Sequence, residues 1–467
     1  MSRAIELTTL RKLNLKIIPV VMICYFIANL DKTNISIAAL QMNADLKLTA
    51  AMYGIGVSMF YVTYIIFEIP SNVILTKVGP RIWIARIMIT WGIISSLMAF
   101  VHTPGQLYVL RLLLGAAEAG FTPGIIYYLS CWFPKTNRAR AMSFFYIGSV
   151  GASVVGLPIG GMLLNLHGAL GLVGWRWLFF LEGIPAVILG IYILFRLVDH
   201  PGKAKWLKPA EASWLTTKLE EERSNAQIGE HEAWYKALGN PIVLALAAVW
   251  FFQAFSSIGI ILFMPLILKS IAPGRGSTVI GLLSALPFLA AGVFMYFNGR
   301  HSDKTGERSL HLGLPVILAG ICMATAVYSP ALLGYVLLVL TVGLTFALTP
   351  VFWAVTTERI AGVAAAASIA LINTVANFVG LGLPPVLGRI KDATGSYDAG
   401  LLIIATALVL SGVIGILVTR NHGAVVAAAA EAGAARRAAE LAAGAGPAAV
   451  GEAVVVDAEQ VTEEGAR

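Results

Sequence analysis

The chain has 467 residues, of which 58% are hydrophobic and only 12% are charged, and its mean hydropathy is +0.80. A soluble domain has about 45–50% apolar and about 25% charged residues, so this composition excludes an ordinary soluble globule. The formal net charge of +8 does not indicate that the protein binds nucleic acid. The basic residues gather in alternate loops, where they report the orientation of membrane spans.

Apolar runs of roughly 18–25 residues recur along the chain, each long enough to cross about 30 Å of hydrocarbon as a helix. The pattern predicts an all-α polytopic membrane protein with twelve transmembrane helices in two pseudo-symmetric halves of six. The predicted spans are 15–39, 53–76, 82–101, 106–131, 140–166, 175–197, 241–268, 278–298, 310–328, 331–355, 364–388 and 398–420.

The expected domain organisation follows from these spans and from the polar stretch between them. Its parts are an N-terminus at 1–14, a six-helix bundle at 15–198, a central loop at 199–239, a second bundle at 240–420 and a tail at 421–467. Lysine and arginine counts place both termini and the central loop in the cytoplasm. Residues 209–223 predict a short amphipathic helix within the loop. The Ala-rich tail lacks an apolar stripe and is predicted to be disordered.

Four charged residues fall inside predicted spans: Asp31 and Lys32 in the first, Arg111 and Glu118 in the fourth. Placing a charged side chain in the bilayer core costs free energy, so such residues usually face a water-filled cavity. Arg111 and Glu118 are seven residues apart and share a helix face, and the depth of Asp31 lets it meet Arg111. Counted along the helices, Asp31, Lys32 and Arg111 are expected toward the outer side and Glu118 deeper, near the midplane. We expect Lys32 and Arg111 to bind a substrate carboxylate, and Asp31 and Glu118 to handle protons. The alternative is a static ion-pair network that locks the two spans together.

Two loops repeat one pattern at equivalent places in the halves, which indicates an internal repeat. The predicted gating or structural residues are Lys77, Gly79 and Arg81 in the first copy, and Gly299, Asp303, Lys304, Gly306 and Arg308 in the second. The first copy has Thr76 where the second has an acid. It therefore lacks one possible ion pair.

Several segments together resemble the anion:cation symporter branch of the major facilitator superfamily, over about residues 10–420. They are Asp31–Asn34, Phe67–Asn72, Arg111–Gly120, Gly174–Pro185, Ser302–Gly306, Phe352–Trp353, Ala370–Asn373 and Lys391–Gly395. That branch includes permeases for tartrate, sugar acids, phthalate and hydroxyphenylacetate, so the resemblance implies the facilitator fold and proton-coupled uptake of an organic carboxylate. The branch usually has arginine where this chain has Lys32. Lysine offers a point charge instead of a bidentate fork.

The resemblance also implies substrate contacts outside the charged group. Tyr64 and Asn373 occupy positions where the family places such contacts, and Trp353 would form an apolar wall, with Ser149 and Asn377 as weaker candidates. Each could equally be a core or interhelical hydrogen-bonding residue.

These observations predict a bacterial inner-membrane importer, not an enzyme, that works as a monomer by proton symport through alternating access. Aromatic acids, hydroxy acids and sugar acids would all suit two cations. No metal or cofactor is expected besides the coupling proton, because the three cysteines form no ligand pattern and the histidines lie in loops or at span edges. Glu68 and Glu182 are interpreted as gate or packing residues. The alternatives are a proton-coupled exporter of small metabolites on the same fold and a non-transporting membrane sensor.

Overall fold

The computed structural model describes residues 2–224, 239–360 and 364–420, and these ranges contain helices and no strands. The α-helices are α1 (Ser2–Lys16), α2 (Ile18–Asp45), α3 (Ala50–Val78), α4 (Pro80–Leu97), α5 (Pro104–Glu118), α6 (Phe121–Ser130), α7 (Lys135–Leu163), α8 (Gly174–Arg196), α9 (Pro209–Ser224), α11 (Pro241–Ile271), α12 (Ser277–Thr305), α13 (Ser309–Val327), α14 (Ala331–Arg359), α15 (Ala364–Thr394) and α16 (Asp398–Thr419). Short 3-10 turns lie at Met98–Phe100, Leu164–Leu166, Ala169–Gly171 and Pro201–Lys203.

Twelve helical segments in these ranges are long and apolar enough to cross a membrane, as the hydropathy pattern predicts. Local signals fix several starts. Proline opens α4, α5 and α11, where its missing N–H removes no helical hydrogen bond. Thr103 and Gln106 form a reciprocal capping box at the start of α5. The predicted disordered tail, 421–467, lies outside the described residues.

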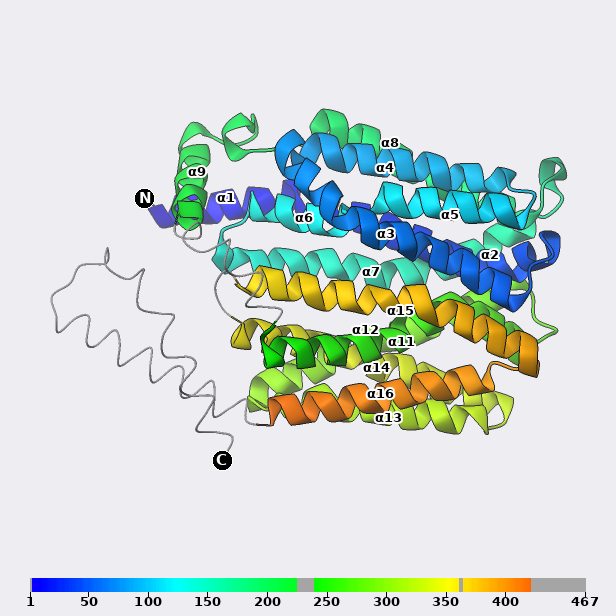
Figure 1. Cartoon of the computed structure of the whole chain (residues 1–467). Helices are drawn as coiled ribbons and strands as arrows, with labels where there is room; N and C mark the ends of the chain where they lie inside the picture. The colour runs from blue at the N-terminus through cyan, green and yellow to red at the C-terminus, as the bar shows by residue number, and fades with distance from the viewer. Residues whose placement is uncertain (1, 225–238, 361–363, 421–467) are drawn as a thin grey trace.

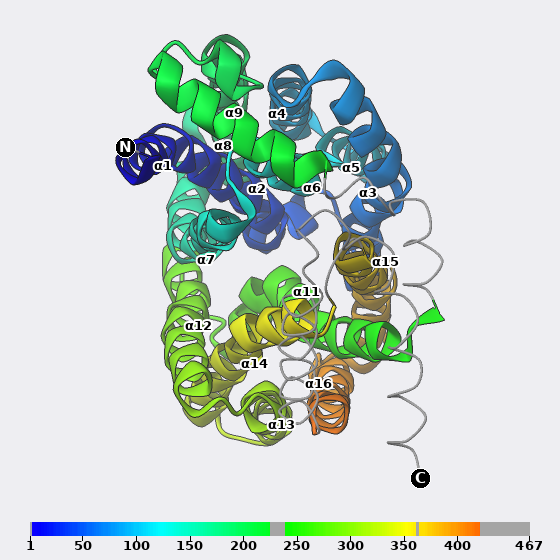
Figure 2. The same cartoon turned by 90° about the vertical axis from the view of Figure 1, so that its left-hand side faces the viewer.

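The spans form two bundles, α2–α8 and α11–α16, which lie one above the other in Figure 1. Across the boundary α3 packs against α15, and α7 packs against α12. Figure 2 views the same two bundles from the end that carries α1 and α9. We call this end of the molecule the α9 end and the other the opposite end.

The central loop is attached to the first half through α9. Lys12 Nζ of α1 lies 2.6 Å from Glu211 Oε2, and the same oxygen accepts a hydrogen bond from the Lys208 backbone N–H at 2.8 Å. Desolvation opposes ionisation of Glu211, but these hydrogen bonds outweigh it and lower the pKa of the carboxyl. Trp206 stacks on Trp132 at 5.4 Å between ring centroids and fixes the segment before α9.

The fourth predicted span, 106–131, is two helices in the structure. Helix α5 ends at Glu118 and α6 begins at Phe121, because Gly120 between them adopts a left-handed conformation with φ of 85°. A Cβ at Gly120 would lie 2.4 Å from Ser71 Oγ of α3, so both the backbone angle and the close packing require glycine. The break places Glu118 on the last turn of α5, about 21 Å along the helix from Pro104 and deep in the bundle.

The two halves meet by direct backbone contact from the middle of the bundle to the opposite end. A Cβ on Gly388 of α15 would lie 2.2 Å from the Ala50 carbonyl oxygen of α3. A Cβ on Gly281 of α12 would lie 2.4 Å from the Leu157 carbonyl oxygen of α7. Both crossings are therefore as close as glycine allows.

Hydrogen bonds between the halves gather in the same region. Both carboxylate oxygens of Asp392 accept the first backbone N–H groups of α3, from Ala50 at 2.9 Å and Ala51 at 2.8 Å. Asn165 Nδ2 donates to Thr278 Oγ1 at 2.8 Å. Tyr53 Oη donates to the Leu262 carbonyl at 2.8 Å. The structure is therefore a conformer closed at the opposite end.

Gly388→Val should prevent this closure, because its side chain would collide with the α3 backbone. The measurement is disulfide formation between Asn165→Cys and Thr278→Cys, on the other helix crossing, with Cys24, Cys131 and Cys322 replaced by serine. We expect efficient cross-linking with Gly388 and strongly reduced cross-linking with valine.

Gly382→Val on the same helix is the matched control, because a Cβ there meets nothing within 4 Å. It should leave the cross-link intact. Equal cross-linking in the Gly388 and Gly382 variants would contradict the closed-end interpretation.

Candidate functional site: a charged pocket between the halves

A small pocket in the middle of the bundle gathers all four charged residues that the sequence singled out. Its lining residues are Asp31 and Lys32 from α2, Phe60 and Tyr61 from α3, Arg111, Leu114 and Glu118 from α5, and Leu262 from α11. Leu262 belongs to the second half, so the pocket lies at the boundary between the two bundles. The charges and two aromatic rings come from the first half.

Lys32 and Glu118 form an ion pair in this pocket. Lys32 Nζ lies 2.8 Å from Glu118 Oε1, and the Glu118 side chain is only 1% exposed. The approach is short but poorly directed, so neither Glu118 oxygen accepts a well-formed hydrogen bond from a described residue. Among the described residues Glu118 has no second ion-pair partner within 4.0 Å, so its ionised form depends mainly on Lys32.

Arg111 is held by backbone carbonyl groups and not by an acid. Its Nε donates to the Gly56 carbonyl at 3.2 Å and its Nη2 to the Val57 carbonyl at 3.5 Å, both on α3. The guanidinium lies 4.9 Å from the centre of the Phe60 ring. No carboxylate of the described residues lies within 4.0 Å of it, and Nη1 makes no described hydrogen bond. A buried cation with a spare donor is suited to bind an anion.

Asp31 and Arg111 line the same pocket, in keeping with their expected depths, but no ion pair within 4.0 Å joins them. Asp31 Oδ1 instead accepts a short hydrogen bond from Ser95 Oγ of α4, and Asp31 is buried. The expected separation of Lys32 from Glu118 by depth was wrong. Counting residues along straight helices missed the Lys32–Glu118 contact, since α5 stops at Glu118 and the adjacent side chains of Asp31 and Lys32 have different partners.

A family model described as the Major Facilitator Superfamily matches residues 21–384, which is most of the chain. The chain belongs to the Major Facilitator Superfamily. It is therefore a membrane transporter, not an enzyme.

Three named bacterial transporters are similar to this chain over most of its length. A protein of Agrobacterium vitis named as a tartrate transporter is 43% identical over 90% of this chain and 97% of its own length. A Pseudomonas putida protein named as the metabolite transport protein NicT is 39% identical over 86% and 92%. An Acinetobacter baumannii protein named as a quinolone resistance transporter is 35% identical over 86% and 93%. The first two are consistent with the anion:cation symporter branch.

Solved structures share the fold at low sequence identity. A bacterial homologue of the lysosomal transporter Spinster, in an inward-facing conformation, matches with a TM-score of 0.71 at 19% identity over 86% of this chain and 96% of that chain. The D-xylose–proton symporter matches with a TM-score of 0.69 at 16% identity over 86% and 97%. Both confirm the twelve-helix facilitator fold.

The other predicted substrate residues divide between the halves. The buried Tyr64 ring does not line the pocket but lies behind it, 5.3 Å from Lys32 Nζ and stacked on Phe60. Ser149 Oγ of α7 donates to Asn29 Oδ1 of α2 at 3.0 Å and joins two first-half helices.

The second-half candidates do not line the pocket in this conformer. Trp353 packs edge-on against Trp250 at 5.2 Å. Asn373 Nδ2 donates to the Ile369 carbonyl of its own helix at 3.1 Å. Asn377 is half-buried on the same helix, about one turn further along.

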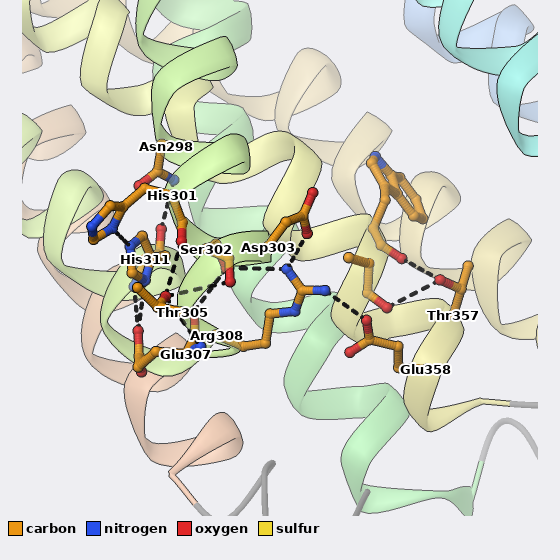
Figure 3. A network of polar contacts seen from close by, with 12 residues as sticks. Asn298, His301, Ser302, Asp303, Thr305, Glu307, Arg308, His311, Thr357 and Glu358 are labelled. Atoms are coloured by element: carbon orange, nitrogen blue, oxygen red, sulfur yellow. Dashed lines mark hydrogen bonds and ion pairs between the residues drawn. The ribbon is translucent and has the colours of Figure 1, made fainter.

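The second-half loop forms a polar network at the α9 end (Figure 3). Arg308 Nη1 lies 2.7 Å from Asp303 Oδ1, and its Nη2 lies 2.8 Å from Glu358 Oε1 of α14. These hydrogen bonds raise the pKa of the Arg308 guanidinium against the opposing effect of burial. Gly306 ends α12 with φ of 69°, which permits the reversal, and Gly299 packs against Pro350.

The first-half loop replaces its missing acid with a residue from elsewhere in the chain. Asp199, directly after α8, accepts a hydrogen bond from the Arg81 backbone N–H at 2.8 Å, and its carboxylate lies 3.9 Å from Arg81 Nε. Gly79, with φ of 99°, brings the chain close to this carboxylate. The expectation that Thr76 leaves the loop one ion pair short holds only for local sequence.

Sequence reasoning missed Ser95, the hydrogen-bond donor to Asp31. A serine within an apolar span is common and has no periodic signal, so only its position beside α2 reveals the contact. Phe60, Tyr61 and Leu262 were also missed, because residues of these types are common in apolar spans and only the fold shows which of them line the pocket.

Lys32→Met should destabilise the protein by leaving Glu118 buried without its cation. Breaking a buried pair typically costs about 3–5 kcal/mol, and we expect less here because the Lys32 side chain is 33% exposed. Lys32→Met should lower the melting temperature of purified protein, and adding Glu118→Gln should restore most of the loss. Recovery in the double variant separates electrostatic loss from lost lysine packing. A double variant as unstable as Lys32→Met would contradict the proposed pair.

Proposed function

We propose that this facilitator imports an organic carboxylate together with protons through alternating access. The observation that carries the proposal is the Lys32–Glu118 pair, 2.8 Å apart in a buried pocket beside the unpaired Arg111. One cation is occupied by an acid and the other is available to an anion. A buried ionisable pair that a ligand can separate supplies a physical link between ligand binding and protonation.

Charge balance supports coupling to protons. In their ordinary ionised forms, Asp31 and Glu118 balance Lys32 and Arg111. A carboxylate that enters therefore brings an uncompensated negative charge into a low-dielectric region. Protonation of a pocket acid restores neutrality.

Glu118 is the first group we expect to take this proton. A substrate carboxylate that draws Lys32 toward itself leaves Glu118 without a described partner, and an isolated buried carboxylate is neutralised by a proton. Asp31, which faces the same pocket, would serve as the second proton-handling group. Substrate and proton then cross as a neutral complex when the halves rearrange.

The basic loops support a cytoplasmic α9 end, so the closed opposite end would face the outside of a bacterial inner membrane. The conformer is then closed to the outside. Alternating access requires the crossings at Gly388 and Gly281 to separate before a substrate enters from that side. One chain supplies both halves of the pocket, which supports a monomer as the working unit.

The substrate class is a small carboxylate such as a hydroxy acid, aromatic acid or sugar acid. The relative named as a tartrate transporter supports a hydroxy acid. Trp353, Asn373 and Asn377 would select among these acids from the second half when the halves close around the substrate.

A proton-coupled exporter is the second candidate, because one relative is named as a quinolone resistance transporter. Quinolones also carry a carboxylate, so the charged pocket alone does not separate these functions. The direction of coupling does. In a symporter, an inward proton gradient drives substrate inward, whereas in an antiporter it drives substrate outward.

We expect proteoliposomes that contain the protein to accumulate labelled tartrate, or another acid found by thermal-shift screening of carboxylates, when the outside is acidified. A protonophore should abolish this accumulation. Glu118→Gln should abolish it as well, but should retain substrate exchange across the membrane, because exchange needs no net proton movement.

Glu220→Gln is the matched control. It makes the same chemical change on an exposed position of α9 and should behave like the unmodified protein. Accumulation that survives the protonophore, or that survives Glu118→Gln, would refute proton symport. Substrate efflux driven by the inward gradient would establish the exporter.

Arg111→Lys should weaken substrate binding although it keeps the charge. Lysine cannot hold the Gly56 and Val57 carbonyl groups and present a further donor at the same time. A lost hydrogen bond to a charged group is worth about 1.5–3 kcal/mol, so we expect the half-saturating concentration to rise roughly tenfold to a hundredfold. Arg420→Lys, at an exposed position, is the control. An unchanged half-saturating concentration would remove Arg111 from the binding site.

A further inference from the structure

Glu182 of α8 is a buried carboxylate that the transport scheme leaves unused. It is 6% exposed and does not line the charged pocket. Neither of its oxygens has a hydrogen-bond partner among the described residues. The sequence pattern alone suggested a gate or packing residue, but an acid at this depth without a described hydrogen-bond partner requires a chemical explanation.

Two polar residues of α2 face Glu182, and both are buried. Helix α2 packs against α8, and its Asn34 and Asp31 side chains act electrostatically on the Glu182 carboxyl, although Asn34 makes no well-formed hydrogen bond with it in this conformer. Asn34 Nδ2 is itself without a well-formed hydrogen bond. No described cation pairs with Glu182 within 4.0 Å, in contrast to Glu118 and its lysine.

The crossing of α4 and α8 supports a dry environment here. A Cβ on Gly183, the residue after Glu182, would lie 2.3 Å from Ser96 Oγ and 2.7 Å from the Gly92 carbonyl oxygen. Ser95, the residue before Ser96, donates to Asp31. One turn of α4 therefore contacts both Asp31, through Ser95, and the segment after Glu182, through Ser96.

We propose that Glu182 is a positioning residue, held as a neutral carboxylic acid that pairs with the Asn34 amide and so supports Asp31. The predicted effect of Glu182 on uptake rests on the proposed function, proton symport. A neutral acid has one O–H donor and one carbonyl acceptor, which match the acceptor and donor of an amide. An ionised Glu182 would instead place a further buried negative charge near Asp31, with no described cation within 4.0 Å of Glu182 to balance it.

This arrangement gives the three buried acids within the membrane spans, Asp31, Glu118 and Glu182, different roles. Glu182 keeps its proton throughout the cycle and orients Asn34, one helical turn from Asp31. Asp31 and Glu118, which line the pocket, exchange theirs.

Infrared spectroscopy of the purified full-length protein tests the protonation state without any transport assay. The difference between the unmodified protein and Glu182→Gln at neutral pH should contain the carbonyl stretch of a protonated carboxylic acid. Asn34→Leu should shift that band, because the acid loses its amide partner. Glu118→Gln is the matched comparison. The difference between the unmodified protein and this variant should contain the protonated-acid band only when a carboxylate ligand is added.

The pH profile of uptake tests the positioning role. Glu182→Met should move the pH of half-maximal uptake upward by about one unit, the size expected for one lost hydrogen bond near an ionised group. Glu182→Gln should restore the original profile, because its amide can pair with Asn34. A residue that only fills space would leave the profile unmoved in both variants.

The infrared and uptake measurements distinguish failure of the Glu182 proposal from failure of the proposed function. Absence of the acid band at neutral pH would overturn the proposal by showing an ionised Glu182, whether or not the protein couples to protons. An uptake profile that is unchanged in Glu182→Met would also overturn it. Loss of proton-driven uptake in the unmodified protein would refute the proposed function and leave the infrared result to decide the state of Glu182.

Discussion

A charge in the low-dielectric centre of this bundle has to be balanced by a neighbouring side chain, a bound ion or a proton. The pocket meets this requirement unevenly. Lys32 and Glu118 balance each other at 2.8 Å, whereas Arg111 is anchored by carbonyl groups of α3 and keeps spare binding capacity. The unequal arrangement makes the site responsive, because an arriving anion changes which groups are neutralised.

The environment of each acid assigns its duty. Glu118 faces a lysine, Asp31 accepts a hydrogen bond from Ser95, and Glu182 has an amide and another acid as neighbours. The three side chains are chemically alike, so their differences arise from partners on other helices. The break after Glu118 contributes to this, because it ends α5 where that carboxylate meets α2.

Small residues at the crossings between the halves connect the pocket to conformational change. Glycines on α12 and α15 let carbonyl groups of α7 and α3 approach directly, and the Asp392 carboxylate caps α3 from across the boundary. These contacts are short-ranged and form only when the opposite end is closed. The closed crossings also bring Leu262 over the pocket, so closure at this end and the shape of the site are parts of one geometry.

The order of residues was enough to predict the number of spans, the two halves, the loop motifs and the four charged residues of the pocket. Hydropathy and charge rarity are local properties and can be read without coordinates. Its account of the partners was less accurate, since it placed Lys32 and Glu118 at different depths although they form an ion pair. The fold was needed to show that Ser95 donates to Asp31, that Asp199 completes the Arg81 loop and that no described cation lies within 4.0 Å of Glu182. These contacts join helices far apart in the chain, and their geometry depends on helix rotation and on the break at Gly120, which periodicity along one segment does not encode.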